Sequence, residues 1–276
     1  MTSSNCSSGD NVEIISAVAD ATKCRVVIFD FDGTLSLIRS GWPQIMIPMM
    51  VDLLAELRGD ESETELTAVV EEYVAHLTGK QTIYQMIELA KQISFRGGKA
   101  LDPMIYKHMY LERLDAYIKL RVEGLESGTT APDTLMVPGS RRLLKTLKER
   151  GLCLYLASGT DEPYLRREAA LLQIDSYFDG HIYGALEDYK NFSKKILINR
   201  ILYEKNIEGQ DILAFGDGYV EIENVKRVGG YAVGVASDEP ICLHVDPVKR
   251  TRLVRSGADW IIPNYNQLDE LLGILF

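Results

Sequence analysis

Residues 25–35 read Arg-Val-Val-Ile-Phe-Asp-Phe-Asp-Gly-Thr-Leu, and the interpretation of the whole chain starts from this stretch. An apolar run rich in β-branched and aromatic residues ends at two aspartates, Asp30 and Asp32, one residue apart. Such a run is typical of a strand buried on both faces of a parallel sheet. The aspartates then lie at the carboxyl end of the strand, where open α/β sheets bind their ligands. Gly33 permits a sharp turn there, and Thr34 offers a hydroxyl and an N–H group to an anion.

The composition is that of an ordinary globular protein: 46% of the 276 residues are hydrophobic and 25% are charged. The net charge of -10 argues against general binding to nucleic acids or anionic membranes. A small anionic substrate remains compatible with this charge, because basic groups or a metal ion can reverse the sign inside one pocket.

Membrane and export signals are not evident in the sequence. No apolar run approaches the roughly 20 residues needed to span a bilayer, and residues 1–10 lack the pattern of a signal peptide. We expect these first residues to be disordered. The four cysteines and four histidines show no metal-ligand spacing, and Cys153 is expected to be a buried apolar residue. A reducing, cytoplasmic location is therefore expected.

Short apolar runs alternate with amphipathic stretches along much of the chain. Further strands are predicted at 152–157, 211–215, 231–235 and 259–262. Helices are predicted at 141–150, 194–203 and 267–272, and a short one at 12–21. The stripe of the second helix consists of Ile196, Leu197, Ile201 and Leu202. Strands that alternate with helices predict right-handed βαβ units and a parallel sheet.

The region 41–132 has a different pattern, with no clear buried strand. It is predicted to form helices at 43–57, 63–77, 82–92 and 102–121. We therefore predict an α/β fold in which a helical domain interrupts the core after its first strand. The predicted parts are an N-terminal extension (1–22), a core domain (23–40 and 133–276) and a helical domain (41–132).

Three later segments add polar side chains at the ends of predicted strands or the starts of helices. Ser158 and Gly159 follow the second strand and offer a hydroxyl and N–H groups to an anion. Lys190, Lys194 and Lys195 form a basic group before the third strand. After that strand come Asp217 and Glu221, which lie four residues apart and so can share one face of a helix. Together with Asp30, these two acids suit a hard divalent cation such as Mg²⁺.

This order of motifs resembles the haloacid dehalogenase-like hydrolase superfamily. The matching positions are Asp30-Phe31-Asp32-Gly33-Thr34, then Ser158, then a lysine, then Asp217 with Glu221. The resemblance implies a Rossmann-like core with an inserted helical cap of the C1 type, as in phosphoserine phosphatase and β-phosphoglucomutase. Two features depart from the usual pattern. Glu221 stands where aspartate is more usual, and the lysine is either Lys194, which the spacing favours, or Lys190.

The resemblance implies a Mg²⁺-dependent phosphatase that hydrolyses a small phosphorylated metabolite through an aspartyl phosphate. Asp30 would be the nucleophile, Asp32 the general acid and base, and Lys194 the catalytic lysine. The implied phosphate-binding residues are Thr34, Ser158, Gly159 and Lys194, with Lys190 as the alternative. The implied metal ligands are Asp30, the Asp32 backbone carbonyl, Asp217 and Glu221.

Other interpretations stay open. A phosphomutase would use the same aspartyl phosphate, and a non-catalytic protein on this fold would bind a phosphometabolite without turnover. The chain is expected to be a monomer or a homodimer. Polar and aromatic residues near predicted linkers and turns are candidates for substrate contact, although packing or surface roles are more usual for them. These candidates are Arg39, Trp42, Lys80, Gln81 and Arg96. The charged segment 238–255 either covers the site or forms an interface.

Overall fold

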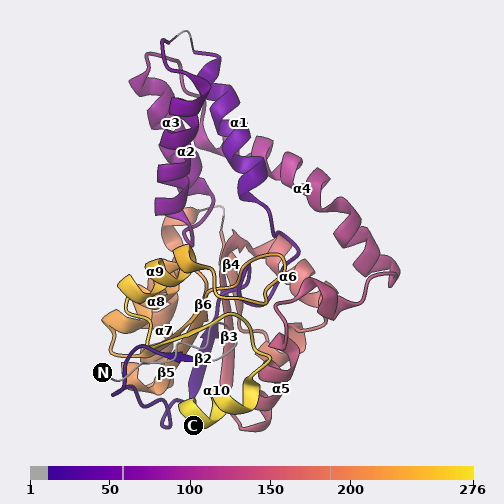
Figure 1. Cartoon of the computed structure of the whole chain (residues 1–276), viewed down its shortest axis with the longest axis vertical. Coiled ribbons are helices and arrows are strands. Elements are labelled where there is room, and N and C mark those ends of the chain that lie inside the picture. The colour runs from indigo at the N-terminus through magenta and orange to yellow at the C-terminus, as the bar shows by residue number, and fades with distance from the viewer. Residues whose placement is uncertain (1–11, 58, 187) are drawn as a thin grey trace, which may run out of the picture.

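The computed structural model describes residues 12–57, 59–186 and 188–276, so the disorder predicted for the first ten residues lies outside the described part. The chain forms an α/β domain with a group of helices above it (Figure 1). This architecture confirms the predicted fold class, a parallel-sheet core with a helical insertion. None of the described helices is both long and apolar enough to cross a membrane.

The core contains a seven-stranded sheet in the order β1-β7-β6-β5-β2-β3-β4. The strands are β1 (Glu13–Ile14), β2 (Val26–Phe29), β3 (Cys153–Asp161), β4 (Ile182–Ala185), β5 (Ile212–Gly216), β6 (Tyr231–Val235) and β7 (Trp260–Ile262). All neighbouring strands run parallel except β1 and β7. Phe29, the last residue of β2, pairs with Leu156 of β3 and Phe215 of β5. The residues that follow these positions therefore meet at one edge of the sheet.

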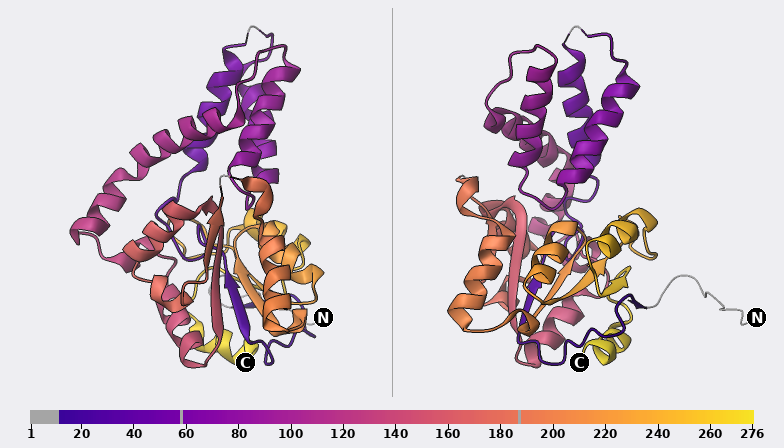
Figure 2. Two further views of the ribbon diagram at one scale, coloured as in Figure 1. Left: turned by 180° about the vertical axis from the view of Figure 1, so that it is seen from behind. Right: turned by 90° about the vertical axis from the view of Figure 1, so that its left-hand side faces the viewer.

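Helices cover both faces of the sheet (Figure 2). One face carries α5 (Ser140–Glu149), α6 (Glu162–Leu171) and α10 (Leu268–Leu275), and the other carries α7 (Lys194–Lys205), α8 (Tyr219–Arg227) and α9 (Pro247–Arg255). Val27 and Phe29 pack on the first face, and Val26 and Ile28 on the second. Because β2 is buried on both faces, every one of its residues is apolar.

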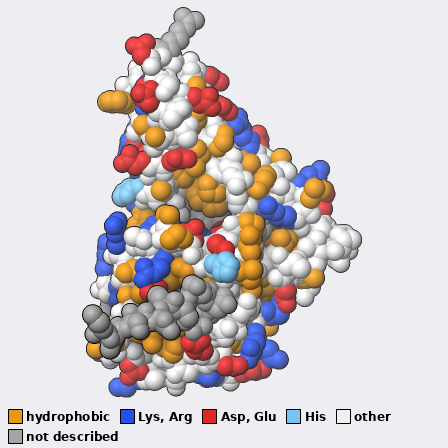
Figure 3. Space-filling view, in the orientation of Figure 1, with side chains coloured by type: hydrophobic (Ala, Val, Ile, Leu, Met, Phe, Trp, Pro, Cys, Tyr) orange, Lys and Arg blue, Asp and Glu red, His pale blue; other side chains and the backbone are white. Residues whose placement is uncertain are grey.

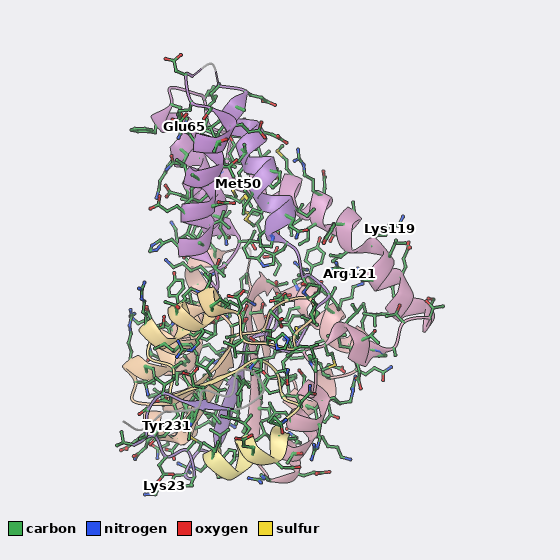
Figure 4. The ribbon with its side chains drawn as sticks, viewed as in Figure 1. Lys23, Met50, Glu65, Lys119, Arg121 and Tyr231 are labelled. Carbon is green, nitrogen blue, oxygen red and sulfur yellow. The ribbon has the colours of Figure 1, made fainter. Side chains whose placement is uncertain are left out.

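The insertion consists of α1 (Pro43–Ala55), α2 (Glu63–Leu77), α3 (Ile83–Phe95) and α4 (Pro103–Ser127). We call these helices the cap. Met50 lies among the cap helices, Glu65 lies near their outer end, and Arg121 lies on α4 near the core (Figure 4). The Arg121 guanidinium donates hydrogen bonds to the carbonyls of Ile38 and Ser40, both at 2.8 Å. These bonds tie the last cap helix to the linker that enters the cap.

Several local predictions were wrong. Residues 12–21 contain strand β1 rather than a helix, because this segment pairs with the edge strand β7. Strand β3 continues through Ser158 and Gly159 to Asp161, beyond its predicted end at residue 157. Strand β4 was not predicted, and α4 ends at Ser127 rather than at 121. Ile196 is 45% exposed instead of buried, and Cys153 is only half-buried.

Candidate active site

The loop after β2 holds its shape through backbone hydrogen bonds and one glycine. The Asp30 N–H group donates to the Phe215 carbonyl at 2.9 Å, which fixes the start of the loop against β5. Gly33 has a φ of +73°, and a Cβ atom there would lie 2.8 Å from Glu239 Oε1 and 2.9 Å from Asp217 Cγ. A larger residue would thus be strained and would displace two acidic side chains. Glycine is required because the loop turns sharply directly beneath those carboxylates.

A cavity of about 90 Å³ lies between this sheet edge and the cap. Its core side is formed by Asp30, Asp32, Ser158, Gly159, Thr160, Lys194 and Asp217. Its other side is formed by the linker and the cap, through Arg39, Trp42, Met46, Thr78, Gly79, Lys80, Thr82, Gln85 and Tyr110. On the face shown in Figure 3, hydrophobic side chains gather on the cap just above its junction with the core, and acidic side chains lie below them. Most of the predicted site residues thus line one cavity.

Asp30 and Lys194 form a buried ion pair at the bottom of this cavity. Lys194 Nζ donates to Asp30 Oδ1 at 2.6 Å and also contacts Glu221 Oε1. The three residues are 5–7% exposed. Burial raises the pKa of Asp30, and the Lys194 ammonium opposes this effect. The N-cap Ser193, whose hydroxyl accepts from the Ile196 N–H, starts α7 directly before Lys194 and so fixes the position of the lysine.

Glu221 lies in the first turn of α8 and was predicted to be a metal ligand. The structure instead places Glu221 Oε1 against Lys194 Nζ. Its other oxygen, Oε2, is buried without a hydrogen-bond partner in the described part of the chain. The role of Glu221 as a metal ligand stays a prediction, and an oxygen without a partner is compatible with it. The ion pair with Lys194 also favours a role in holding the ammonium beside Asp30, because an opposite charge attracts a buried cation strongly.

Only one of the two carboxylate oxygens of Asp32 has a hydrogen-bond partner among the described residues. Its Oδ2 accepts a hydrogen bond from the Thr160 hydroxyl at 2.7 Å, whereas its Oδ1 is buried without a partner among the described residues. Burial raises the pKa of Asp32 to about 7, against the opposing charge of Arg39. Sequence analysis did not select Thr160, although it belongs to the same Ser-Gly-Thr segment as Ser158. The unexpected length of β3 brings it to the cavity.

Thr34 does not line the cavity, and its predicted contact with phosphate does not fit the structure. Its side chain is fully buried, and its hydroxyl accepts from the Asp217 N–H at 3.0 Å. This bond joins the loop after β2 to the loop after β5. Ser158 does line the cavity, and its hydroxyl accepts from the Thr160 N–H at 3.0 Å. Ser158 is therefore placed to contact a ligand, and Thr34 is placed to support the two loops.

Two other candidates lie away from the cavity. Lys190 is exposed, and its ammonium group lies 5.9 Å from the centre of the Tyr189 ring, so Lys194 is the lysine that the fold brings to Asp30. Arg96 forms an ion pair with Glu61 at 2.5 Å and does not line the cavity.

Segment 238–255 supplies two residues that sequence analysis did not identify. Lys249, on α9, donates to Asp217 Oδ2 at 3.1 Å and to Glu239 Oε1 at 2.5 Å. Burial alone would lower the pKa of Lys249, but these carboxylates raise it overall. The segment therefore folds against the site. This is one of the two alternatives predicted for the segment, but Lys249 and Glu239 themselves were not identified, because the approach of α9 to the end of β5 is a tertiary contact.

The charges at this sheet edge bear on whether a metal ion fits. Within 12–57, 59–186 and 188–276, no three acidic, histidine or cysteine side chains are arranged as a ready metal site. Lys194 and Lys249 instead bridge carboxylates that come from different loops. The carboxylates of this cluster nevertheless outnumber the two ammonium groups: Asp30, Asp32, Asp217, Glu221 and Glu239. Oxygen donors with excess negative charge suit Mg²⁺, which keeps waters and needs few protein ligands.

The cap closes directly onto the second motif. A Cβ atom on Gly159 would lie 2.7 Å from the Lys80 carbonyl oxygen, so the cap turn at residues 78–82 touches β3. Gln81 Nε2 donates to the carbonyls of Tyr189 and Phe192 at 3.0 and 2.6 Å. Lys107 of α4, buried in the cap, pairs with Asp161 of the core at 2.6 Å. Gln81, a predicted substrate contact, thus fastens the cap to the core.

Comparisons with known proteins agree with this geometry. The sequence model of the haloacid dehalogenase-like hydrolase family matches residues 24–229. No curated protein sequence matches the chain significantly.

Solved structures share the fold at low sequence identity. A structure from Haemophilus somnus, described as a predicted phosphoglycolate phosphatase, has a TM-score of 0.58 at 15% identity, over 91% of this chain and 99% of that one. A predicted phosphatase from Clostridium acetobutylicum has a TM-score of 0.57 at 17% identity, over 91% and 99%. β-Phosphoglucomutase from Clostridium difficile has a TM-score of 0.51 at 17% identity, over 84% and 95%. Because the family model covers most of the sequence, the chain belongs to the haloacid dehalogenase-like hydrolase family.

Proposed function

We propose that the protein is a Mg²⁺-dependent phosphatase that hydrolyses a small phosphorylated metabolite through an aspartyl-phosphate intermediate. The observation that carries this proposal is the pair of aspartates in one cavity. Asp30 contacts the Lys194 ammonium, while Asp32 keeps one carboxylate oxygen without a partner in the described chain. The first aspartate suits a nucleophile, and the second suits a proton donor and acceptor.

In the first step, a carboxylate oxygen of Asp30 attacks the phosphorus atom, and the bond from phosphorus to the substrate oxygen breaks. Lys194 and Ser158 line the same cavity and neutralise or hydrogen-bond the phosphoryl oxygens. Phosphoryl transfer depends mainly on positioning and charge stabilisation, so these few groups are sufficient. Glu221 supports the step by holding the Lys194 ammonium.

Asp32 handles the proton in both steps. When it carries a proton, it gives that proton to the departing substrate oxygen, and it then takes one from the water that hydrolyses the aspartyl phosphate. The Thr160 hydroxyl fixes one carboxylate oxygen, which leaves Oδ1 for the reacting group. The dry surroundings favour the protonated form of this acid.

Asp30, Asp217 and the Asp32 backbone carbonyl would hold Mg²⁺, which supplies charge neutralisation between the Asp30 carboxylate and the phosphoryl group. The Thr34 hydroxyl and Lys249 position Asp217 for this task. Removal of divalent metal with EDTA is expected to abolish phosphate release, and added Mg²⁺ is expected to restore it.

The first test measures phosphate release from acetyl phosphate and from a panel of small phosphomonoesters, with Mg²⁺ or with EDTA. Asp30→Asn should lower kcat at least about 10³-fold, because the nucleophile is lost, and should leave the melting temperature nearly unchanged. An active Asp30→Asn variant would contradict the assignment. Transfer of the phosphoryl group to a second substrate hydroxyl, with little phosphate release, would identify a phosphomutase instead.

The lysine assignment has its own matched control. Lys194→Ala should lower kcat by about 10² or more, because the fixed charge beside the phosphoryl group is lost. Lys190→Ala should retain wild-type kcat, because its ammonium group lies over Tyr189. The opposite pattern would refute the placement of Lys194 at the phosphate.

A further inference from the structure

The side of the cavity that the linker and the cap form contains polar groups that the proposed mechanism does not use. This wall, which we call the leaving-group subsite, consists of Arg39, Trp42, Met46, Gln85 and Tyr110. The cavity of about 90 Å³ is small, so a short leaving group fits it best beside a phosphoryl group.

Gln85 has an unsatisfied amide within this subsite. The side chain, on α3, is 4% exposed and lines the cavity. Its Nε2 approaches the Leu77 carbonyl at 3.5 Å, and its Oε1 is buried without a partner in the described part of the chain. An unpaired buried carbonyl is unfavourable, so a ligand that donates a hydrogen bond to it is favoured. A hydroxyl group meets this need in either orientation of the amide, because it both donates and accepts.

Arg39 supplies a hydrogen-bond donor whose positive charge is already paired with a carboxylate. Its guanidinium forms a buried, bidentate pair with Glu168, at 2.7 Å from Nη2 and at 3.0 and 3.1 Å from Nε. Arg39 and Glu168 are 6% and 3% exposed. These bonds leave Nη1 without a hydrogen bond to the described residues, while the charge of Arg39 is neutralised by Glu168. The subsite can therefore hydrogen-bond a hydroxyl group but gives a carboxylate no uncompensated buried cation.

Lys80 is a cation of this cavity that could bind an anionic leaving group. Its side chain is exposed at the rim of the cavity, where water screens its charge. Trp42 and Met46 add apolar surface against which a short carbon chain can pack. The groups on the wall thus match carbon atoms that carry hydroxyls better than they match a second acidic group.

We propose that the leaving-group subsite selects phosphomonoesters whose leaving group is a short, uncharged polyol, through a hydrogen bond that a hydroxyl donates to Gln85 and one that a hydroxyl accepts from Arg39. This inference rests on the proposed phosphatase function and names the substrate class of the same site. Gln85 is the specificity-determining residue, and Arg39 is the donor that Glu168 orients.

The test compares kcat/KM for glycerol 3-phosphate, erythritol 4-phosphate and 3-phosphoglycerate, with acetyl phosphate as the reference. The wild type should prefer glycerol 3-phosphate over 3-phosphoglycerate, which has the same carbon count, by at least tenfold. Gln85→Leu should lower the ratio of kcat/KM for glycerol 3-phosphate to that for acetyl phosphate at least tenfold. Gln92→Leu, on the same helix but bonded to Glu88 and Arg96, should keep this ratio.

The outcomes separate the two proposals. If acetyl phosphate is not hydrolysed with Mg²⁺, the phosphatase function fails, and this inference fails with it. If acetyl phosphate is hydrolysed but 3-phosphoglycerate is the better monoester, the inference is overturned while the phosphatase function stands. An unchanged substrate ratio in Gln85→Leu also overturns it. The wild-type comparison decides the question by itself if that variant does not fold.

Discussion

Substitution of Gly159 by alanine tests whether the cap must touch the second motif during catalysis. The backbone of Gly159 is not in the left-handed region, so alanine is compatible with its conformation. The added Cβ atom would lie 2.7 Å from the Lys80 carbonyl oxygen and 3.4 Å from the Gln81 Cα atom. A carbon atom and a carbonyl oxygen approach to about 3.3 Å at closest, so the cap turn must move by roughly 0.6 Å.

That displacement should lower the activity strongly and the stability only slightly. A misplacement of about 1 Å can cost a factor of about 10² in rate, so we expect Gly159→Ala to lower kcat/KM by about tenfold to a hundredfold. The melting temperature should change by less than about 4 °C, the shift that 1 kcal/mol produces in a protein of this size. Hydrogen exchange should become faster at residues 78–82, where the Lys80 N–H now donates to the Leu77 carbonyl.

The control is Gly59→Ala in the cap, where the nearest atom to an added Cβ is 3.9 Å away and no activity loss is expected. Wild-type kcat/KM in Gly159→Ala would refute the reasoning, because it would mean that the cap turn can move away without any loss of activity. Loss of activity with a fall in melting temperature well beyond 4 °C would also refute it, since the damage would then lie in β3 itself.

Two further substitutions test the buried polar contacts. Thr160→Val removes the hydrogen bond to Asp32, a charged-group bond of about 1.5–3 kcal/mol, and should lower kcat at least tenfold for alkyl phosphates. Acetyl phosphate should be affected less, since its leaving group needs little protonation, and an equal loss for both substrates would contradict the acid role. Glu168→Ala leaves the Arg39 guanidinium buried and unpaired, which should lower the free energy of unfolding in urea by about 3–5 kcal/mol. The control is Glu126→Ala, because Glu126 forms an exposed ion pair with Arg167, and it should lower the free energy of unfolding by less than about 1 kcal/mol. A similar loss of stability in both variants would contradict the idea that breaking the buried pair is more destabilising than breaking an exposed one.

Much of the site was predictable because its two acidic motifs directly follow strands β2 and β5. The position of Asp30 follows from the apolar run before it, and Phe29 pairs with both Leu156 and Phe215. Parallel register then brings the residues after these strands together at one edge of the sheet, independently of the length and conformation of the segments that connect the strands. The position of Lys194 follows from a local signal as well, the Ser193 cap that starts its helix.

Other contacts had no local signal. The Thr34 hydroxyl supports Asp217 instead of facing the cavity, because a fully buried hydroxyl takes the nearest donor. Lys249 reaches the site because α9 packs at the end of β5, and nothing in segment 238–255 indicates where that helix lies. Glu221 contacts Lys194, a choice between ion partners that spacing along a helix does not determine.

The sequence by itself thus determined the parallel core, the helical insertion and the identity of the two aspartates, because hydrophobic periodicity and strand ends are local properties of the chain. Only the tertiary structure decided which carboxylates pair with which lysines, that the cap turn rests on Gly159, and that Gln85 and Arg39 line the same cavity as Asp30. These contacts join residues far apart in the chain, and their geometry depends on how the cap packs on the core. The chemistry is therefore encoded locally, whereas the choice of substrate is a property of the assembled cavity.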